Sequence, residues 1–120
     1  MFDDYLVINK KNETDLYDKN LKLFKKFDRN IEFWYAYDDC KYRSFTDKNT
    51  NREGIIDDKF NIVVDNLKRA TDVRNDSYFT FQNGFKYGFM DYKGNILISF
   101  SIFDSFNDSA FKPVEELDWF

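Results

Sequence analysis

Histidine is absent from the 120-residue sequence, and cysteine occurs only once, as Cys40. The chain therefore lacks the usual general base near neutral pH, which excludes Ser-His-Asp and Cys-His catalysis and every His-ligated metal site. A lone cysteine forms no intramolecular disulfide and no cysteine-based zinc cage, and a free thiol suits a reducing cytosol. With no histidine to activate it, Cys40 is expected to be buried or inert. We expect no enzymatic activity, no cofactor and no metal ion.

Glycine and proline are scarce, and long apolar runs are missing. Four glycines and one proline exclude a collagen-like or low-complexity chain. The longest apolar stretches, such as residues 96–98, fall far short of the ~20 residues that a membrane-spanning helix needs. Residues 1–9 lack the basic start and apolar run of a signal peptide. We therefore expect a cytoplasmic protein that does not contact membranes.

Aromatic residues, by contrast, are abundant: 15 Phe, 8 Tyr and 2 Trp make up 21% of the chain. Each buried ring removes roughly 150–250 Å² from water, so a packed core can form and disorder is excluded. The length corresponds to about one domain, and no linker rich in Pro or Gly interrupts the sequence. We expect residues 1–120 to form a single domain.

The charge is unevenly distributed along the chain. The sequence contains 22 acidic and 18 basic side chains, for a net charge of -4. Seven of the acids but only three of the bases lie in residues 76–120, so this part carries the whole excess. An acidic surface repels phosphate backbones and suits a basic protein partner. We expect a protein partner and no nucleic acid.

Apolar periodicity predicts two amphipathic helices, over about 13–28 and 57–70. Apolar residues recur there every three or four positions, and Asp57 or Asp58 can cap the second helix. The stripes are Tyr17, Leu21, Phe24 and Phe27 in the first segment, and Phe60, Val63, Val64 and Leu67 in the second. Residues 4–9, 31–37 and 42–46 are rich in aromatic and β-branched side chains and predict strands.

The last third of the chain predicts a β-meander over about 78–103. Asn83-Gly84 is the preferred pair for a two-residue type I′ turn, and residues 92–95 predict a second turn before a third strand. With the two helices, this predicts an α+β fold whose antiparallel sheet ends in the C-terminal meander.

Residues 87–98, Tyr-Gly-Phe-Met-Asp-Tyr-Lys-Gly-Asn-Ile-Leu-Ile, resemble a WG-type β repeat. The shared pattern is aromatic-Gly-aromatic-x-Asp, two residues, a turn glycine and an apolar strand. The likeness extends to Ala110, so it covers residues 87–110, and Ser99 replaces the usual proline. We identify a single copy, whereas arrays are needed for solenoid-like stacking. The resemblance implies a β-hairpin and a protein-interaction adaptor without an active site.

The whole chain also resembles, in type, the small acidic immunity proteins of bacterial toxin systems, particularly contact-dependent growth inhibition. That resemblance implies a cytoplasmic, monomeric inhibitor that binds and occludes a cognate toxin domain. A nuclease toxin with a basic active-site cleft would suit acidic side chains that mimic phosphates. The alternatives are the WG-like adaptor and an anti-defence inhibitor of phage or bacterial origin.

Two segments that combine acids with aromatic rings are the candidate partner-binding residues. In the first, Tyr35 and Tyr37 share one face of a strand and precede Asp38 and Asp39, which otherwise form only a solvated turn. The second segment is the C-terminal run, which forms either an exposed anchor or a contact with the body of the protein. Its candidate residues are Glu115, Glu116, Asp118 and Trp119.

Overall fold

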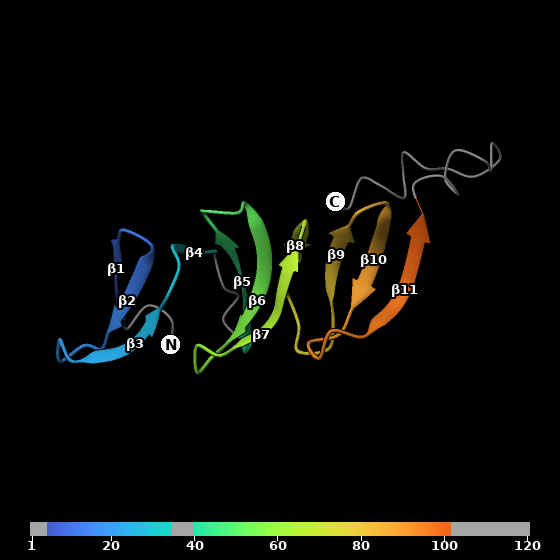
Figure 1. Cartoon of the computed structure of the whole chain (residues 1–120). Helices are drawn as coiled ribbons and strands as arrows, with labels where there is room; N and C mark the ends of the chain where they lie inside the picture. The colour runs from blue at the N-terminus through green and yellow to red at the C-terminus, as the bar shows by residue number, and fades with distance from the viewer. Residues whose placement is uncertain (1–4, 35–39, 102–120) are drawn as a thin grey trace.

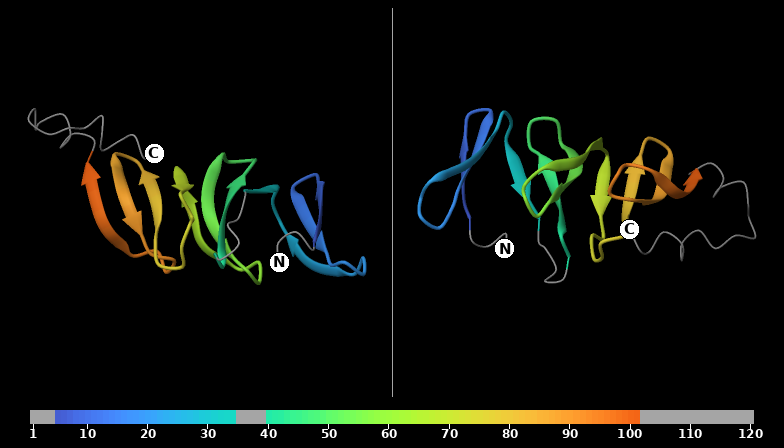
Figure 2. Two further views of the ribbon diagram at one scale, coloured as in Figure 1. Left: turned by 180° about the vertical axis from the view of Figure 1, so that it is seen from behind. Right: turned by 90° about the horizontal axis from the view of Figure 1, so that it is seen from below.

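The computed structural model describes residues 5–34 and 40–101, and these residues contain eleven β-strands and no helix. The strands form three antiparallel sheets that lie side by side in a row (Figure 1). Figure 2 shows the same row from behind and from below. The molecule measures 57 × 30 × 21 Å along its principal axes, and the stacking of the sheets accounts for its length.

Each sheet contains a three-strand meander. The first sheet consists of β1 (Leu6–Lys10), β2 (Glu13–Tyr17) and β3 (Leu23–Phe27). The second consists of β4 (Ile31–Phe33), β5 (Tyr42–Asp47), β6 (Arg52–Asp57) and β7 (Ile62–Leu67). The third consists of β8 (Arg69–Thr71), β9 (Phe79–Asn83), β10 (Lys86–Met90) and β11 (Ile96–Ser101). We call the meanders β1–β3, β5–β7 and β9–β11 repeats 1, 2 and 3; β4 and β8 pair with the first strand of the repeat that follows.

The same aspartate turn joins the second and third strands of every repeat. Asp57 Oδ1 accepts hydrogen bonds from the backbone N–H groups of Lys59 (2.9 Å) and Asn61 (2.8 Å). Asp18 and Asp91 accept the equivalent bonds, from residues two and four positions later, at 2.8–3.0 Å. The third residue after each aspartate has a positive φ: +62° at Leu21, +64° at Phe60 and +87° at Gly94. In Figure 1 the three turns lie on one edge of the row and the first hairpin of each repeat on the other.

The meander of repeat 3 is therefore repeated along the chain, whereas only one WG-like copy, at 87–110, was expected; residues 102–110 lie outside the described residues. Residues 54–63 repeat residues 88–97, with Gly, Asp, Lys, Asn and Ile at the same five positions. The same turn places a third copy around Asp18. A tandem array of meanders is present, and each repeat can bury its faces against its neighbours.

The expected α+β class is wrong, because neither predicted helix exists. Residues 13–28 contain β2, the turn at Asp18 and β3, and residues 57–70 contain the end of β6, β7 and the start of β8. The helical spacing combined apolar residues from two strands and the turn between them. Leu21 and Phe60, which completed the two stripes, lie in the turns with a positive φ that interrupts any right-handed helix.

The expected C-terminal meander is present as β9–β11, with a shifted first turn. Asn83 pairs with Lys86, so the two-residue loop is Gly84-Phe85 and not Asn83-Gly84. Gly84 has a φ of +61°, and among the two loop residues only Gly84 has a positive φ. This is the pattern of a type II′ turn, in which glycine takes the first central position.

The hydrophobic core lies at the two boundaries between repeats. Leu16 and Phe27 of repeat 1 pack with Ile31, Phe45, Ile56 and Phe60 at the first boundary. At the second boundary, Ile55, Val64 and Leu67 of repeat 2 pack with residues that include Ala70, Phe79, Phe81 and Met90. Ile55 and Ile56 belong to opposite clusters because successive side chains of a strand point to opposite faces. Repeat 2 is therefore covered on both faces.

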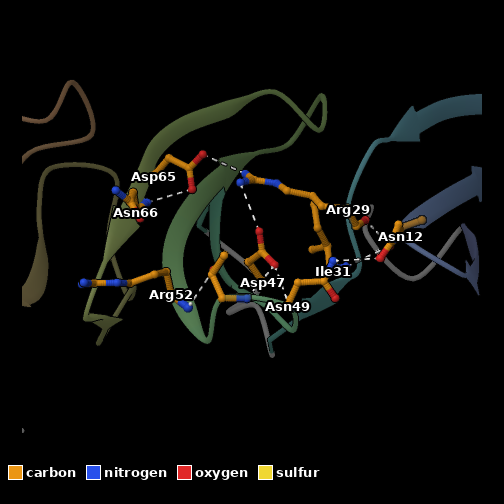
Figure 3. A network of polar contacts seen from close by, with 10 residues as sticks. Asn12, Arg29, Ile31, Asp47, Asn49, Arg52, Asp65 and Asn66 are labelled. Carbon is orange, nitrogen blue, oxygen red and sulfur yellow. Dashed lines mark hydrogen bonds and ion pairs between the residues drawn. The ribbon is translucent and has the colours of Figure 1, made fainter.

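Polar contacts also link neighbouring repeats (Figure 3). Arg29 lies between Asp47 (3.4 Å) and Asp65 (2.8 Å), with its guanidinium 5.3 Å from the Phe45 ring centroid. The backbone N–H of Ile31 donates to Thr14 Oγ1 (2.8 Å), and that of Ala70 donates to Glu53 Oε1 (2.8 Å). Thr14 and Ile31 each precede their counterparts by 39 residues, the same spacing as Asp18 and Asp57. The two boundaries thus share one mode of packing.

The aspartate turn predicts a loss of stability in acid. The backbone N–H of Asn95 is the largest cause that lowers the pKa of Asp91, so folding favours its ionised form. A carboxylate whose pKa is lower in the folded state contributes stability above its unfolded pKa, near 3.8, and loses it as the pH falls through the folded value. We expect Asp91→Asn to flatten the fall in the free energy of unfolding between about pH 4 and pH 2, measured by urea unfolding. Asp58→Asn, whose carboxylate lies outside the hydrogen bonds of the equivalent turn, is the control; equal acid slopes for parent and Asp91→Asn would contradict this account.

Candidate functional site

The eight residues expected to bind a partner lie outside the described part of the chain. They are Tyr35, Tyr37, Asp38, Asp39, Glu115, Glu116, Asp118 and Trp119. Their role stays a prediction. Trp34, which directly precedes the first of these segments, is described, and 45% of its surface is exposed.

The structure shows a groove at each boundary between repeats. The first boundary groove, of about 350 Å³, is lined by residues that include Tyr5, Glu32, Phe33, Arg43 and Lys48. The second boundary groove, of about 440 Å³, is lined by residues that include Trp34, Glu53, Arg69, Asp72 and Arg74. Both grooves run beside the strand that leads into the next repeat, and Phe33 precedes Asp72 by the same 39 residues that separate the aspartate turns. The repeat architecture thus places one groove at each boundary.

Trp34 presents an exposed but anchored ring in the second boundary groove. Its indole N–H donates to Thr46 Oγ1 (2.7 Å), and its backbone N–H donates to the Ser44 carbonyl oxygen (3.0 Å). These bonds fix the side chain against β5. A fixed aromatic face loses little conformational entropy on binding, which is one reason why tryptophan is enriched at binding hot spots.

Both grooves are lined by cationic as well as aromatic side chains. In the second groove, Arg74 lies 3.7 Å from Asp72, and Glu53 is committed to the backbone N–H of Ala70. Arg69 is exposed beside them. Guanidinium groups bind carboxylates with paired hydrogen bonds and stack on aromatic rings. The grooves can therefore accept a ligand that carries carboxylate and aromatic groups.

Other chemistry finds little support in the described residues. Cys40 is buried, as expected, and its thiol lies 3.3 Å from the Asn75 carbonyl oxygen. Burial raises the pKa of this thiol and so disfavours the nucleophilic thiolate. Residues 5–34 and 40–101 contain no group of three or more His, Cys, Asp or Glu side chains that could hold a metal ion. Within the same residues, no helix is long and apolar enough to cross a membrane.

Sequence reasoning missed both grooves because it missed the repeats. Trp34 lies in the predicted strand 31–37 and Arg69 in the predicted helix 57–70, and neither element indicates a groove. The shared string at residues 54–63 and 88–97 was the available signal. The 39-residue spacing between Asp18 and Asp57 also separates Ile31 from Ala70, so β4 and β8 are equivalent connecting strands.

The fold and its grooves define a class of architecture: tandem β-meander repeats stacked in a row, with one groove at each boundary. No known protein family, curated protein or solved structure matches the chain significantly.

Proposed function

We propose that the protein is a non-catalytic protein-binding module that holds an extended segment of a partner across its two boundary grooves. The observation that carries this proposal is that each of the two boundaries has a groove lined by both aromatic and cationic side chains. Stacked repeats characteristically bind partners over extended surfaces that cross several units. The WG-type resemblance of residues 87–110 implies the same adaptor role.

The chemistry of the grooves favours an acidic, aromatic-containing peptide segment. Each groove, at about 350 and 440 Å³, has the size of a pocket for one or two side chains. Exposed tryptophan and arginine are the residues most often found at hot spots of protein interfaces. Two such sites along one row can bind two points of the same linear segment. Binding at one site raises the effective concentration of the segment at the other, so the overall affinity exceeds that of either site alone.

Inhibition of a bacterial toxin in the cytoplasm is a narrower proposal within this class. It comes from the immunity-type resemblance and from acidic residues that lie outside the described part of the chain. The two proposals differ in the charge that they require of the partner. An acidic anchor selects a basic cleft, whereas the boundary grooves select an acidic segment.

A phage-displayed library of random linear peptides, selected on the full chain, tests the groove proposal. We expect the enriched peptides to combine Asp or Glu with aromatic residues. Trp34→Ala should weaken their binding by about 30-fold, the loss typical of a hot-spot residue. Phe85→Ala, which removes an exposed aromatic ring from the β9–β10 hairpin tip, is the matched control and should bind like the parent.

Charge reversal gives a second measurement on the same peptides. Arg69→Glu should slow association and reduce its dependence on salt, whereas Lys93→Glu, on the opposite edge of repeat 3 at the aspartate turn, should change neither. Enrichment of Lys- and Arg-rich peptides would favour the toxin-inhibitor proposal instead. Parental binding by both Trp34→Ala and Arg69→Glu would show that the grooves are not the site.

A further inference from the structure

Repeat 3 lies at one end of the row (Figure 1), and its outer face exposes apolar side chains. Leu97 and Ile98 of β11 are both 52% exposed. A groove of about 310 Å³ on this face is lined by Tyr78, Phe89, Leu97 and Ile98. We call these four residues the end face. Its area is apolar and open, which is unusual for a surface without a binding role.

The equivalent face of repeat 2 is buried, and the structure shows what covers it. Counting from the aspartate turns, Phe89 and Ile98 correspond to Ile55 and Val64, which lie in the core at the second boundary. The chain that follows β7 covers them: Ala70, Val73 and Phe79 belong to the same cluster. The end face is thus the surface on which the chain after the third strand packs at an internal boundary.

A short string within this covering segment makes polar contacts with the residues just before β5 and with Tyr92 of repeat 3. The Asn75 carbonyl oxygen lies 3.3 Å from Cys40 Sγ and 2.7 Å from the Tyr92 hydroxyl. Asp76 Oδ1 accepts the backbone N–H of Lys41 (2.9 Å), and the side chain of Phe79 is fully buried. Residues 75–79, Asn-Asp-Ser-Tyr-Phe, therefore provide both the polar and the apolar contacts of docking.

The same string occurs once more in the sequence, after β11. Residues 107–111 are Asn-Asp-Ser-Ala-Phe, identical to residues 75–79 at four of five positions. Five residues separate β11 from Asn107, and seven separate β7 from Asn75. Five residues span up to roughly 17 Å, which is enough to reach across the adjoining strands of repeat 3.

We propose that the end face is the docking site of the chain's own residues 102–111, with Phe111 taking the part that Phe79 takes at the second boundary. The proposal follows from the exposed side chains of Tyr78, Leu97 and Ile98, from the way the chain covers the equivalent face of repeat 2, and from the repeated string. It is independent of the proposed partner-binding function, because the boundary grooves lie beside β4 and β8 and not on this face.

Hydrogen–deuterium exchange of the full chain tests the proposal. Phe111→Asp should accelerate exchange of the β11 amides (residues 96–101) by at least about tenfold, because it removes the cover from an edge strand. Ile98→Asp should accelerate exchange in residues 107–111 to a similar extent. Ile98 is half exposed, so this variant is expected to keep its fold, which circular dichroism checks.

Two controls separate docking from general loss of stability. Leu21→Asp, on the opposite end of the row, and Phe120→Asp should leave exchange of β11 unchanged. Sedimentation at low and high protein concentration should give a monomer for the parent and for Phe111→Asp. Unchanged exchange in both Phe111→Asp and Ile98→Asp would overturn the proposal, as would a dimer that Phe111→Asp dissociates, because the segment would then come from a second copy.

Discussion

Replacing Gly54 by alanine is expected to destabilise the protein by about 3 kcal/mol, because the added methyl group has no space. A Cβ at this position would collide with the Val64 carbonyl oxygen of the adjoining strand and would lie 2.7 Å from the Phe45 ring. The carbonyl belongs to the backbone of the sheet, and Phe45 is fully buried at the first boundary. Neither can move without disturbing the packing of repeat 2.

The repeats themselves show that this position is under steric control. Gly88 holds the equivalent place in repeat 3, where a Cβ would collide with the Ile98 carbonyl oxygen. Repeat 1 has Asp15 there, with its side chain fully buried and paired with Lys10 at 2.9 Å. Repeat 1 is the first in the row of described repeats, and its β2–β3 register shift between Leu16 and Tyr17 has equivalents in repeats 2 and 3. Only the repeats with a preceding neighbour use glycine.

Equilibrium unfolding in urea of Gly54→Ala and of Gly84→Ala measures the effect. Gly84 is the matched control, since a Cβ there meets no atom within 4 Å and its only cost is a positive φ of +61°. That cost is about 1–2 kcal/mol, so Gly54→Ala should lose clearly more stability. Equal losses would mean that the close approach at Gly54 is unimportant, and Gly88→Ala repeats the comparison in repeat 3.

Sequence reasoning predicted repeat 3 and failed on repeats 1 and 2 for one local reason. In repeat 3, Gly84 and Gly94 stand at the positions of positive φ, so ordinary turn signals mark both ends of β10. In repeats 1 and 2, the residue equivalent to Gly94 is Leu21 or Phe60. An apolar residue at this position removes the usual sequence signal of a turn. It also adds an apolar residue at helical spacing, so the segment matches the pattern of an amphipathic helix.

The candidate site was beyond prediction for a different reason. The second boundary groove combines Trp34 with Arg69 and Arg74, which lie more than thirty positions away. Only the stacking of repeat 3 on repeat 2 brings them together, and that stacking follows from the repeat register that the helix assignment concealed. The composition did predict a protein rich in buried rings, which the boundary clusters confirm.

Replacing Phe60 by glycine is expected to destabilise the protein by about 2–3 kcal/mol, although it removes backbone strain. Loss of a buried phenylalanine side chain costs about 3–5 kcal/mol of stability. Glycine relieves the backbone strain at a positive φ, which offsets about 1–2 kcal/mol of that loss. Phe60 is 2% exposed, and its ring centroid lies 4.8 Å from that of Tyr5 and 5.9 Å from that of Phe33. The Tyr5 contact joins Phe60 to the residues just before β1, and the Phe33 contact joins it to β4; both explain why a strained residue is kept in this turn.

Leu21→Gly is the matched variant, and we expect it to change the free energy of unfolding in the opposite direction. Leu21 occupies the same turn position with nearly the same φ (+62°), but it is 71% exposed, so little burial is lost. Release of strain should then outweigh the greater chain entropy of glycine in the unfolded state, and the free energy of unfolding should rise by up to about 1 kcal/mol. Urea unfolding of the two variants against the parent makes the comparison. A similar loss in both would mean that Leu21 is buried in solution, which would place a further surface against the exposed face of repeat 1.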